Sequence, residues 1–338
     1  MNDMKPDTPL IEVEDLNVVF RAGAMDVHAV RNVSFRIGRS EILALVGESG
    51  SGKSTAGLTL LGLHPRQVTI SGSARMRRKD GSGIDVVGAS ERQLRKLRGN
   101  DVAMIFQEPM FSLNPVHKIG DQIVEALRVH SSMPRAAAWS RALELLTRLG
   151  VPSPDKCLLS YPHQLSGGMR QRVMIAIALS GEPALLIADE PTTALDVTIQ
   201  AQIVDILKSL QSRSQLSILF VSHDLGLVSQ VASRVLVLYA GQIVEEGPLP
   251  DVFQRPRMPY TRALMRSRAQ LGASDRKIEP IPGNVPNLAK LPEGCSFHPR
   301  CPHSVAGLCD VKAPKLESAE EGWRVRCHLW DKIEEARP

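Results

Sequence analysis

The chain has 338 residues, of which 43% are hydrophobic, enough for one large domain or two ordinary ones with a substantial core. Its 41 lysines and arginines against 36 acidic residues give a net charge of +5, a small excess that does not point to a nucleic-acid partner. No apolar run approaches the roughly 20 residues of a membrane-spanning helix, and the opening MNDMKPDTPL lacks the apolar block of a secretory leader. We therefore expect a globular cytosolic protein that does not span a membrane.

The chain begins with segments of strand-like pattern. Apolar and polar residues roughly alternate over residues 11–20 and 29–37, which predicts antiparallel strands. A continuous apolar run at residues 42–46 is followed by a glycine-rich loop and by helical spacing over residues 56–63. The basic cluster at residues 75–79 contains no aromatic residues, so it favours a solvated loop over a nucleic-acid patch.

The glycine-rich loop fits the phosphate-loop pattern G-x-x-x-x-G-K-[ST]. It consists of Gly47, Glu48, Ser49, Gly50, Ser51, Gly52, Lys53, Ser54 and Thr55. We expect the backbone N–H groups of residues 50–53 to bind phosphate at the start of a helix. Lys53 would reach the outer phosphates, and the Ser54 hydroxyl would bind Mg²⁺. The alternative, an ordinary glycine-rich turn, is disfavoured by the flanking strand and helix.

The middle of the chain alternates strand-like and helical patterns. A buried strand at residues 102–106 ends at Gln107, whose amide is a candidate ligand for Mg²⁺ or water, with helix capping as the alternative. Helical spacing over residues 119–129 and 136–149 predicts an inserted helical segment. Patterns of parallel strands separated by helices then predict an α/β core that closes near residue 247; these strands lie at residues 185–188, 217–221 and 235–239.

Chemically active side chains follow two of these strands. Asp189 and Glu190 come at the carboxyl end of a buried strand, where ligands bind in such sheets. We expect Asp189 to hold a metal through its water shell and Glu190 to orient or deprotonate an attacking water. His223 follows another strand and is a candidate contact for a terminal phosphate, although a lone histidine is more often an ordinary surface or core residue.

The segment LSGGMRQR provides a second candidate phosphate contact. Ser166, Gly167 and Gly168 precede a helical run at residues 169–179, so they present a helix N-terminus with free N–H groups. Locally, the alternative is a helix cap made by a serine. A single chain would have little use for two anion sites on one nucleotide.

A resemblance to a known family explains why one chain has two candidate phosphate contacts. With the phosphate loop, Gln107, LSGGMRQR, ALLIADE, Ala194-Leu195-Asp196 and His223, the chain resembles the nucleotide-binding subunit of ATP-binding-cassette transporters over residues 11–250. The resemblance implies an α/β fold: a RecA-like P-loop NTPase core with a parallel sheet, an antiparallel β subdomain and a helical subdomain at about residues 108–180. In that family two cassettes pair head to tail, and the Leu-Ser-Gly-Gly loop of one closes over the ATP bound by the other.

The resemblance also assigns roles to individual residues. It implies that Ser166, Gly167 and Gly168 serve the partner's nucleotide, that Asp196 lies at the dimer seam, that Glu190 is the catalytic carboxylate and that His223 contacts the γ-phosphate. It further implies that Phe20 stacks on the adenine. The alternative for Phe20 is an ordinary half-buried strand residue, because aromatic residues are enriched in strands.

Beyond residue 250 prolines become frequent and periodicity fades, so we expect residues 251–338 to form a separate, irregular extension to the ATPase domain of residues 1–250. It holds Cys295, Cys301, Cys309 and Cys327. Four thiols so near one another suggest a metal site, because a disulfide is disfavoured in the cytosol. The close Cys-x₂₋₄-Cys pairs typical of zinc are missing. Cys157 stands alone and is expected to be a small buried residue.

The segments MPYTRALM, IPG and GCSFHPRCP make this extension similar to the C-terminal region of the oligopeptide, dipeptide and nickel branch of these ATPases. Members of that branch with four such cysteines can carry a [4Fe–4S] cluster, which is the implied cofactor beside ATP and Mg²⁺. Zinc, with His298, His303 or His328 as further ligands, and plain structural thiols are the alternatives.

Together these features predict an ATPase subunit whose dimer closes on MgATP and drives an importer, with di- or oligopeptides as the expected cargo and nickel or another small solute as the alternative. The implied partners are a second cassette in a homodimer or heterodimer, two transmembrane permease subunits and, indirectly, an extracytoplasmic solute-binding protein. The expected location is the cytoplasmic face of the bacterial plasma membrane. A related ATPase acting on DNA is disfavoured, because only about 110 residues without heptads separate the two halves of the cassette.

Contact with the membrane subunits is expected beside Gln107. Met110, Phe111 and Leu113 are the candidate apolar contacts for a short helix of the permease. Packing inside the helical insertion is an equally good interpretation of these three residues.

Overall fold

The structure is a computed structural model that describes residues 8–23, 25–65, 67–107, 112–193, 195–267 and 280–333. It divides into two compact units. The first unit holds the described residues within 1–11, 37–41 and 76–220, and the second holds those within 12–36, 42–75 and 221–338. A helix or strand that crosses a boundary belongs to the unit that contains most of its residues.

The first unit contains three strands of one sheet and a set of helices. Its elements are β5 (Gly83–Asp85), α2 (Glu91–Leu97), β6 (Val102–Ile105), α4 (Ile119–Val129), α5 (Arg135–Arg148), α6 (Pro154–Leu159), η1 (Pro162–Gln164), α7 (Gly167–Leu179), β7 (Leu185–Asp189), α8 (Val197–Ser214) and β8 (Ser217–Ser222). The sheet strands follow the order β8-β7-β6, and β6 pairs with β7 in parallel. Every residue of these three strands is buried, as their continuous apolar patterns predict.

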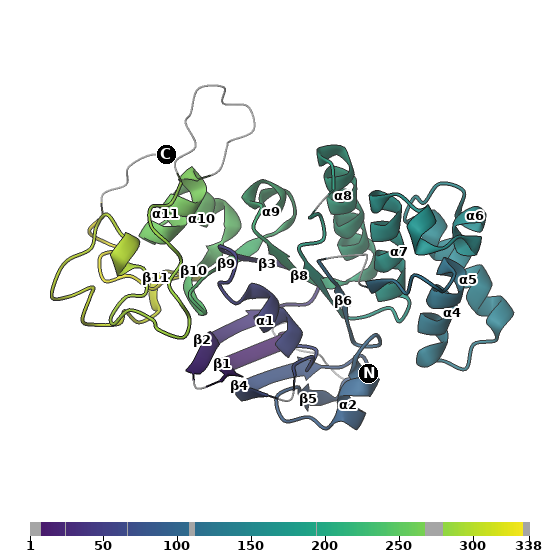
Figure 1. Cartoon of the computed structure of the whole chain (residues 1–338), viewed down its shortest axis with the longest axis horizontal. Coiled ribbons are helices and arrows are strands. Elements are labelled where there is room, and N and C mark those ends of the chain that lie inside the picture. The colour runs from purple at the N-terminus through teal and green to yellow at the C-terminus, as the bar shows by residue number, and fades with distance from the viewer. Residues whose placement is uncertain are drawn as a thin grey trace. The chain divides into compact units, whose positions relative to one another are not determined.

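The helical insertion is present in this unit. Figure 1 shows α4, α5, α6 and α7 packed together, and α4 contacts each of the other three. Ile119, Ile123 and Leu127 are buried at helical spacing along α4, whose bounds match the helical segment expected at residues 119–129. The structure therefore contains the helices that the spacing of apolar residues predicted.

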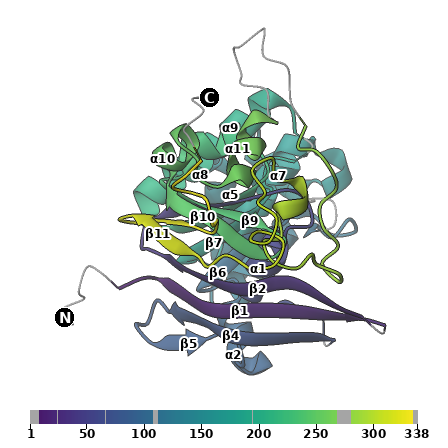
Figure 2. The same ribbon diagram turned by 90° about the vertical axis from the view of Figure 1, so that its left-hand side faces the viewer.

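The second unit contains two sheets. Its elements are β1 (Ile11–Ala22), β2 (Met25–Ile37), β3 (Ile42–Val46), α1 (Lys53–Thr59), β4 (Val68–Arg77), α9 (Leu225–Val231), β9 (Arg234–Tyr239), β10 (Gln242–Pro248), α10 (Leu249–Gln254), α11 (Pro259–Arg266), η2 (His298–Arg300), β11 (Glu317–Glu320) and β12 (Trp323–Val325). Figure 2 shows β2, β1 and β4 side by side in one sheet. In the other sheet the order is β11-β12-β10-β9-β3, and β3 pairs with β9 in parallel.

The C-terminal extension is neither wholly irregular nor separate. Strand β12 pairs antiparallel with β10, so that Glu245 lies opposite Val325, and β11 pairs with β12. The extension therefore continues the sheet that contains β3 and β9. The expectation of a separate tail was wrong because strands of three and four residues among frequent prolines leave almost no periodic signal.

The basic cluster at residues 75–79 also differs from expectation. Arg75 lies on β4 rather than in a loop, and its Nη2 is 3.0 Å from Glu14 Oε2. Arg78 Nε is 3.0 Å from the buried carboxylate of Asp101. These arginines pair with carboxylates of the same chain.

None of the helices in the described part of the chain combines the length and apolarity needed to cross a bilayer.

The join between the extension and the sheet depends on a fully buried carboxylate. Glu245 accepts hydrogen bonds from Trp323 Nε1 at 3.0 Å, from the Arg257 N–H at 2.8 Å and from the Met258 N–H at 3.2 Å. Burial raises the pKa of Glu245, and the three donors act in the opposite direction by stabilising the carboxylate.

We predict that Glu245→Ala lowers the free energy of unfolding by about 3 kcal/mol, because two buried donors and one partly buried donor lose their acceptor. Urea titration followed by circular dichroism measures the change. Glu317→Ala, at an exposed position on β11, should shift the same quantity by less than about 0.5 kcal/mol. Equal effects of the two substitutions would show that Glu245 does not hold this join.

Candidate active site

The phosphate loop lies in the second unit, between the buried strand β3 and helix α1. A Cβ atom on Gly47 would lie 2.2 Å from the carbonyl oxygen of Leu238, and one on Gly52 would lie 2.2 Å from the carbonyl oxygen of Ala29. Gly52 also has a φ of 102°, in the region that favours glycine. The two glycines of the sequence pattern are therefore required by the close approach of neighbouring backbone.

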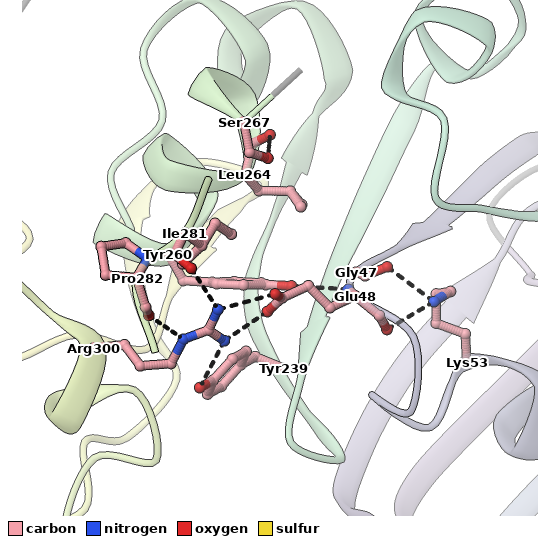
Figure 3. Close-up of polar contacts among 10 residues, drawn as sticks. All are labelled: Gly47, Glu48, Lys53, Tyr239, Tyr260, Leu264, Ser267, Ile281, Pro282 and Arg300. Atoms are coloured by element: carbon pink, nitrogen blue, oxygen red, sulfur yellow. Dashed lines mark hydrogen bonds and ion pairs between the residues drawn. The ribbon is translucent and has the colours of Figure 1, made fainter. Parts of the chain in front are cut away.

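The loop presents hydrogen-bond donors that suit an anion. The buried Lys53 ammonium donates to the carbonyl oxygens of Gly47 at 2.9 Å and Glu48 at 3.0 Å, as Figure 3 shows. The Ser51 hydroxyl is buried, and its oxygen has no hydrogen-bond partner among the described atoms. Ser54 and Thr55 follow in the first turn of α1 and are half-buried. An orphaned hydroxyl beside a buried lysine fits a bound phosphate group.

The predicted metal-binding Asp189 and the predicted catalytic Glu190 lie in the first unit. Asp189 is buried at the end of β7, and Glu190 follows it with a φ of 47°, an uncommon backbone conformation for a residue other than glycine. Glu190 Oε2 accepts hydrogen bonds from Thr193 Oγ1 at 2.9 Å and from Gln107 Nε2 at 3.1 Å. The structure thus brings Glu190 and Gln107 together, and it adds Thr193, whose contact was not predicted from the sequence.

The Leu-Ser-Gly-Gly segment begins helix α7 in the same unit. Ser166 is the N-cap, and its Oγ accepts from the Met169 N–H at 3.4 Å, which is the local capping role considered from the sequence. A Cβ atom on Gly168 would lie 2.9 Å from Ile199 Cγ2, so this glycine allows α7 to approach the start of α8. Asp196 caps α8 by accepting from the Ile199 N–H at 2.9 Å.

A buried glutamine connects α7 to the segment that follows Asp189 and Glu190. Gln171 Nε2 donates to the carbonyl oxygen of Pro191 at 2.6 Å. Sequence reasoning used Gln171 only as part of the LSGGMRQR pattern and missed this contact. The link ties the helix that begins at Ser166 to the turn after Glu190.

Two further candidates lie in the second unit. Phe20 is half-buried on β1, and its ring is nearly perpendicular to that of His64, with centroids 6.3 Å apart. Sequence reasoning missed His64, whose pKa is lowered by burial. His223 is exposed after β8, just before Asp224 caps α9.

The four cysteines of the extension line one pocket together with His298, His303 and His328. Burial raises the pKa of Cys327 to about 12 and also raises the pKa of Cys295 and Cys301, so these thiols need a positive group nearby to ionise. No three acidic, histidine or cysteine side chains in the described residues are arranged to hold a single metal ion.

Some candidates are not placed by the structure or are corrected by it. Met110, Phe111 and Ala194 lie outside the described residues. Leu113 is only 3% exposed, so it packs internally and is not a surface contact for a membrane subunit. Cys157 is buried in α6, as expected for a small apolar residue.

A glycine-bounded loop with a buried lysine and an orphaned hydroxyl is typical of phosphate-loop nucleotide hydrolases. In the first unit, the buried strand that ends at Asp189, with Glu190 after it, is also typical of this class. Comparison with known proteins refines this class. The model of the family "ABC transporter" matches residues 30–193, and that of "Oligopeptide/dipeptide transporter, C-terminal region" matches residues 244–309.

Curated relatives match almost the whole chain. A peptide import ATP-binding protein of Brucella abortus (strain 2308) is 49% identical over 96% of this chain and 98% of its own length. A peptide ABC transporter ATP-binding protein of Sinorhizobium fredii (strain NBRC 101917 / NGR234) is 46% identical over 94% of both chains. The chain therefore belongs to the ATP-binding subunits of ABC transporters, and it is an ATPase whose hydrolysis is coupled to transport.

Solved structures agree with this assignment. A dimeric ATP-binding cassette in a post-hydrolysis state with ADP and Pi has a TM-score of 0.63 and 28% identity, and the match covers 71% of this chain and 98% of that one. A Clostridium perfringens subunit of an ABC transporter complex has a TM-score of 0.60 and 27% identity, over 73% and 91% of the two chains. The cassette fold expected from the sequence is confirmed.

We predict that Gly52→Ala lowers the free energy of unfolding by at least about 3 kcal/mol, since the new Cβ would overlap the Ala29 carbonyl oxygen. Gly50→Ala is the matched control, because its φ is 77° but a Cβ there meets no atom within 4 Å. It should cost only about 1 kcal/mol, from the backbone conformation alone. Equal losses in urea titrations of the two variants would contradict the close approach at Gly52.

Proposed function

We propose that this ATPase drives the import of di- or oligopeptides. The observation that carries the proposal is the match of nearly the whole chain to proteins named for peptide import, combined with the oligopeptide/dipeptide C-terminal region. Nickel or another small solute is the alternative cargo. A reconstituted importer that moves labelled peptide only with MgATP would support the proposal, whereas transport of nickel but not peptide would overturn the cargo.

The predicted site residues would have different roles in binding and hydrolysing ATP. Residues 47–55 bind the triphosphate, with Lys53 on its outer phosphates, and Phe20 stacks on the adenine. Ser54, Gln107 and Asp189 would hold Mg²⁺, directly or through water, and the bound ion would neutralise charge that develops on the phosphates. Glu190 accepts the proton of the attacking water, and His223 contacts the γ-phosphate. The orphaned Ser51 hydroxyl and the bond between Gln107 and Glu190 support these assignments.

We further propose that two cassettes share each nucleotide. Ser166, Gly167 and Gly168 would bind the nucleotide held by the partner chain, and Asp196 would lie at the dimer seam. In support, α7 begins at this segment, and the solved cassette with ADP and Pi is dimeric. The second cassette is either an identical chain or a related one.

The subunit would act at the cytoplasmic face of the bacterial plasma membrane, on two permease subunits served by an extracytoplasmic solute-binding protein. Phe106 is 40% exposed and Val116 is 74% exposed on either side of residues 108–111, and they replace Leu113 as candidate contacts for the permease.

Residues 1–250 would form the ATPase domain, with the helical subdomain at about residues 108–180. Residues 251–338 would form the extension.

We propose that Cys295, Cys301, Cys309 and Cys327 hold a [4Fe–4S] cluster. All four line one pocket, and the raised pKa values of Cys295, Cys301 and Cys327 suit a site where positive iron would stabilise the thiolates. Zinc, with His298, His303 or His328 as further ligands, is the alternative.

We predict that Glu190→Gln lowers ATP hydrolysis by about a hundredfold or more while ATP binding is kept, because the amide cannot accept the proton of the attacking water. The variant should accumulate as an ATP-bound dimer in size-exclusion chromatography. Glu125→Gln, at an exposed position on α4, should hydrolyse ATP normally. Normal turnover by Glu190→Gln would refute the assignment of the base.

We predict that protein purified without oxygen shows a broad brown absorbance that Cys301→Ser abolishes, because one thiolate ligand of the cluster is lost. Cys157→Ser is the control and should keep the colour, since Cys157 lies in α6 and does not line the pocket. A colourless wild-type protein with one equivalent of zinc by elemental analysis would overturn the cluster.

A further inference from the structure

The carboxylate of Glu48, in the phosphate loop, is held by an arginine of the C-terminal extension. Arg300 Nη1 donates to Glu48 Oε2 at 2.8 Å, and Arg300 Nη2 donates to Glu48 Oε1 at 3.0 Å (Figure 3). The Arg300 side chain is only 5% exposed, so solvent screens this pair little. Two parallel charge-assisted bonds fix the orientation of both side chains.

The main chain of Glu48 is held from the extension as well. Its N–H donates to the hydroxyl oxygen of Tyr260 in α11 at 2.9 Å. Tyr260 is fully buried, and its ring centroid lies 4.5 Å from that of Tyr239. The Glu48 carbonyl oxygen accepts from Lys53 Nζ at 3.0 Å. One residue therefore connects two side chains of the extension to the lysine of the phosphate loop.

The guanidinium of Arg300 forms hydrogen bonds within the chain through all of its nitrogens. Its Nε donates to the Pro282 carbonyl oxygen at 2.8 Å, Nη2 also reaches the Ile281 carbonyl oxygen at 3.4 Å, and Nη1 lies 3.4 Å from the Tyr239 hydroxyl. Every nitrogen thus has a partner within the chain. Burial acts to lower the pKa of Arg300, but its bonds to Glu48 and Tyr239 outweigh burial and raise that pKa. The geometry favours a role in holding the loop over direct binding of phosphate.

We propose that Arg300 is a positioning residue for nucleotide binding: by fixing Glu48 it holds the loop carbonyls that orient Lys53. This inference rests on the proposed nucleotide site at residues 47–55. If Arg300 has this role, the C-terminal extension is a structural part of the nucleotide site. The alternative is that the buried pair contributes only to the stability of the fold.

The test is the affinity of the full-length chain for MgATP and MgADP, measured by isothermal titration calorimetry, together with the KM and kcat of ATP hydrolysis. Arg300→Met should weaken nucleotide binding and raise KM by at least about tenfold while kcat changes little, because a displaced lysine loses its alignment on the phosphates. Arg300→Lys should fall between wild type and Arg300→Met, since a point charge cannot make both parallel bonds. Adding Glu48→Gln to Arg300→Met should cause little further loss, as expected for directly coupled residues.

Arg257→Met is the matched control for a purely stabilising role. Arg257 also belongs to the extension, but its side chain binds Glu320 and stacks on the Trp323 ring, 5.0 Å from the centroid. This variant should lower the melting temperature and leave KM and nucleotide affinity unchanged. If Arg300→Met changes only the melting temperature, as Arg257→Met does, the positioning role is refuted.

Lys53→Ala separates failure of this inference from failure of the proposed site. Loss of ATP binding in Lys53→Ala with unchanged binding in a folded Arg300→Met variant would overturn the role of Arg300 alone. Unchanged binding in Lys53→Ala would remove the nucleotide from residues 47–55 and overturn both.

Discussion

The close fit of the phosphate loop against the end of β9 is the constraint on which the second unit depends. Gly47 lies against the Leu238 carbonyl oxygen with no room for a side chain, and the Gly241 N–H donates to the Ser51 carbonyl oxygen at 2.9 Å. Strand β9 also pairs with β10, which pairs with β12, so the loop and the extension share one sheet. A loop held in this way keeps its donors oriented before a ligand arrives, which lowers the cost of binding.

Elements built from local patterns could be predicted from the sequence. The run Ile42–Val46 and the helix Ile119–Val129 have the bounds expected from their apolar spacing, because one element alone determines that spacing. The same holds for the position of Glu190 after β7, since a strand of buried residues must deliver the next side chain to its carboxyl end.

Contacts between distant segments could not be predicted in this way. Arg300 and Glu48 are 252 positions apart, and although Arg300 lies within the segment GCSFHPRCP, that pattern does not identify its partner. Strand β12 was missed because three residues carry no period. For Leu113 the sequence left internal packing and a surface contact open, because an apolar residue in a short segment fits both, and its burial selects internal packing. These features depend on which segments meet in space, whereas periodicity reports only which face of one segment is buried.

The central claim is that the phosphate loop and the C-terminal extension respond to nucleotide as one structure. Hydrogen–deuterium exchange of the full-length chain, with and without saturating MgADP, tests it most directly. Coupled sites influence each other reciprocally, so nucleotide should slow amide exchange at residues 48–53 and also at residues 257–262 and 297–301. Protection of the loop with unchanged exchange in both segments of the extension would contradict the claim.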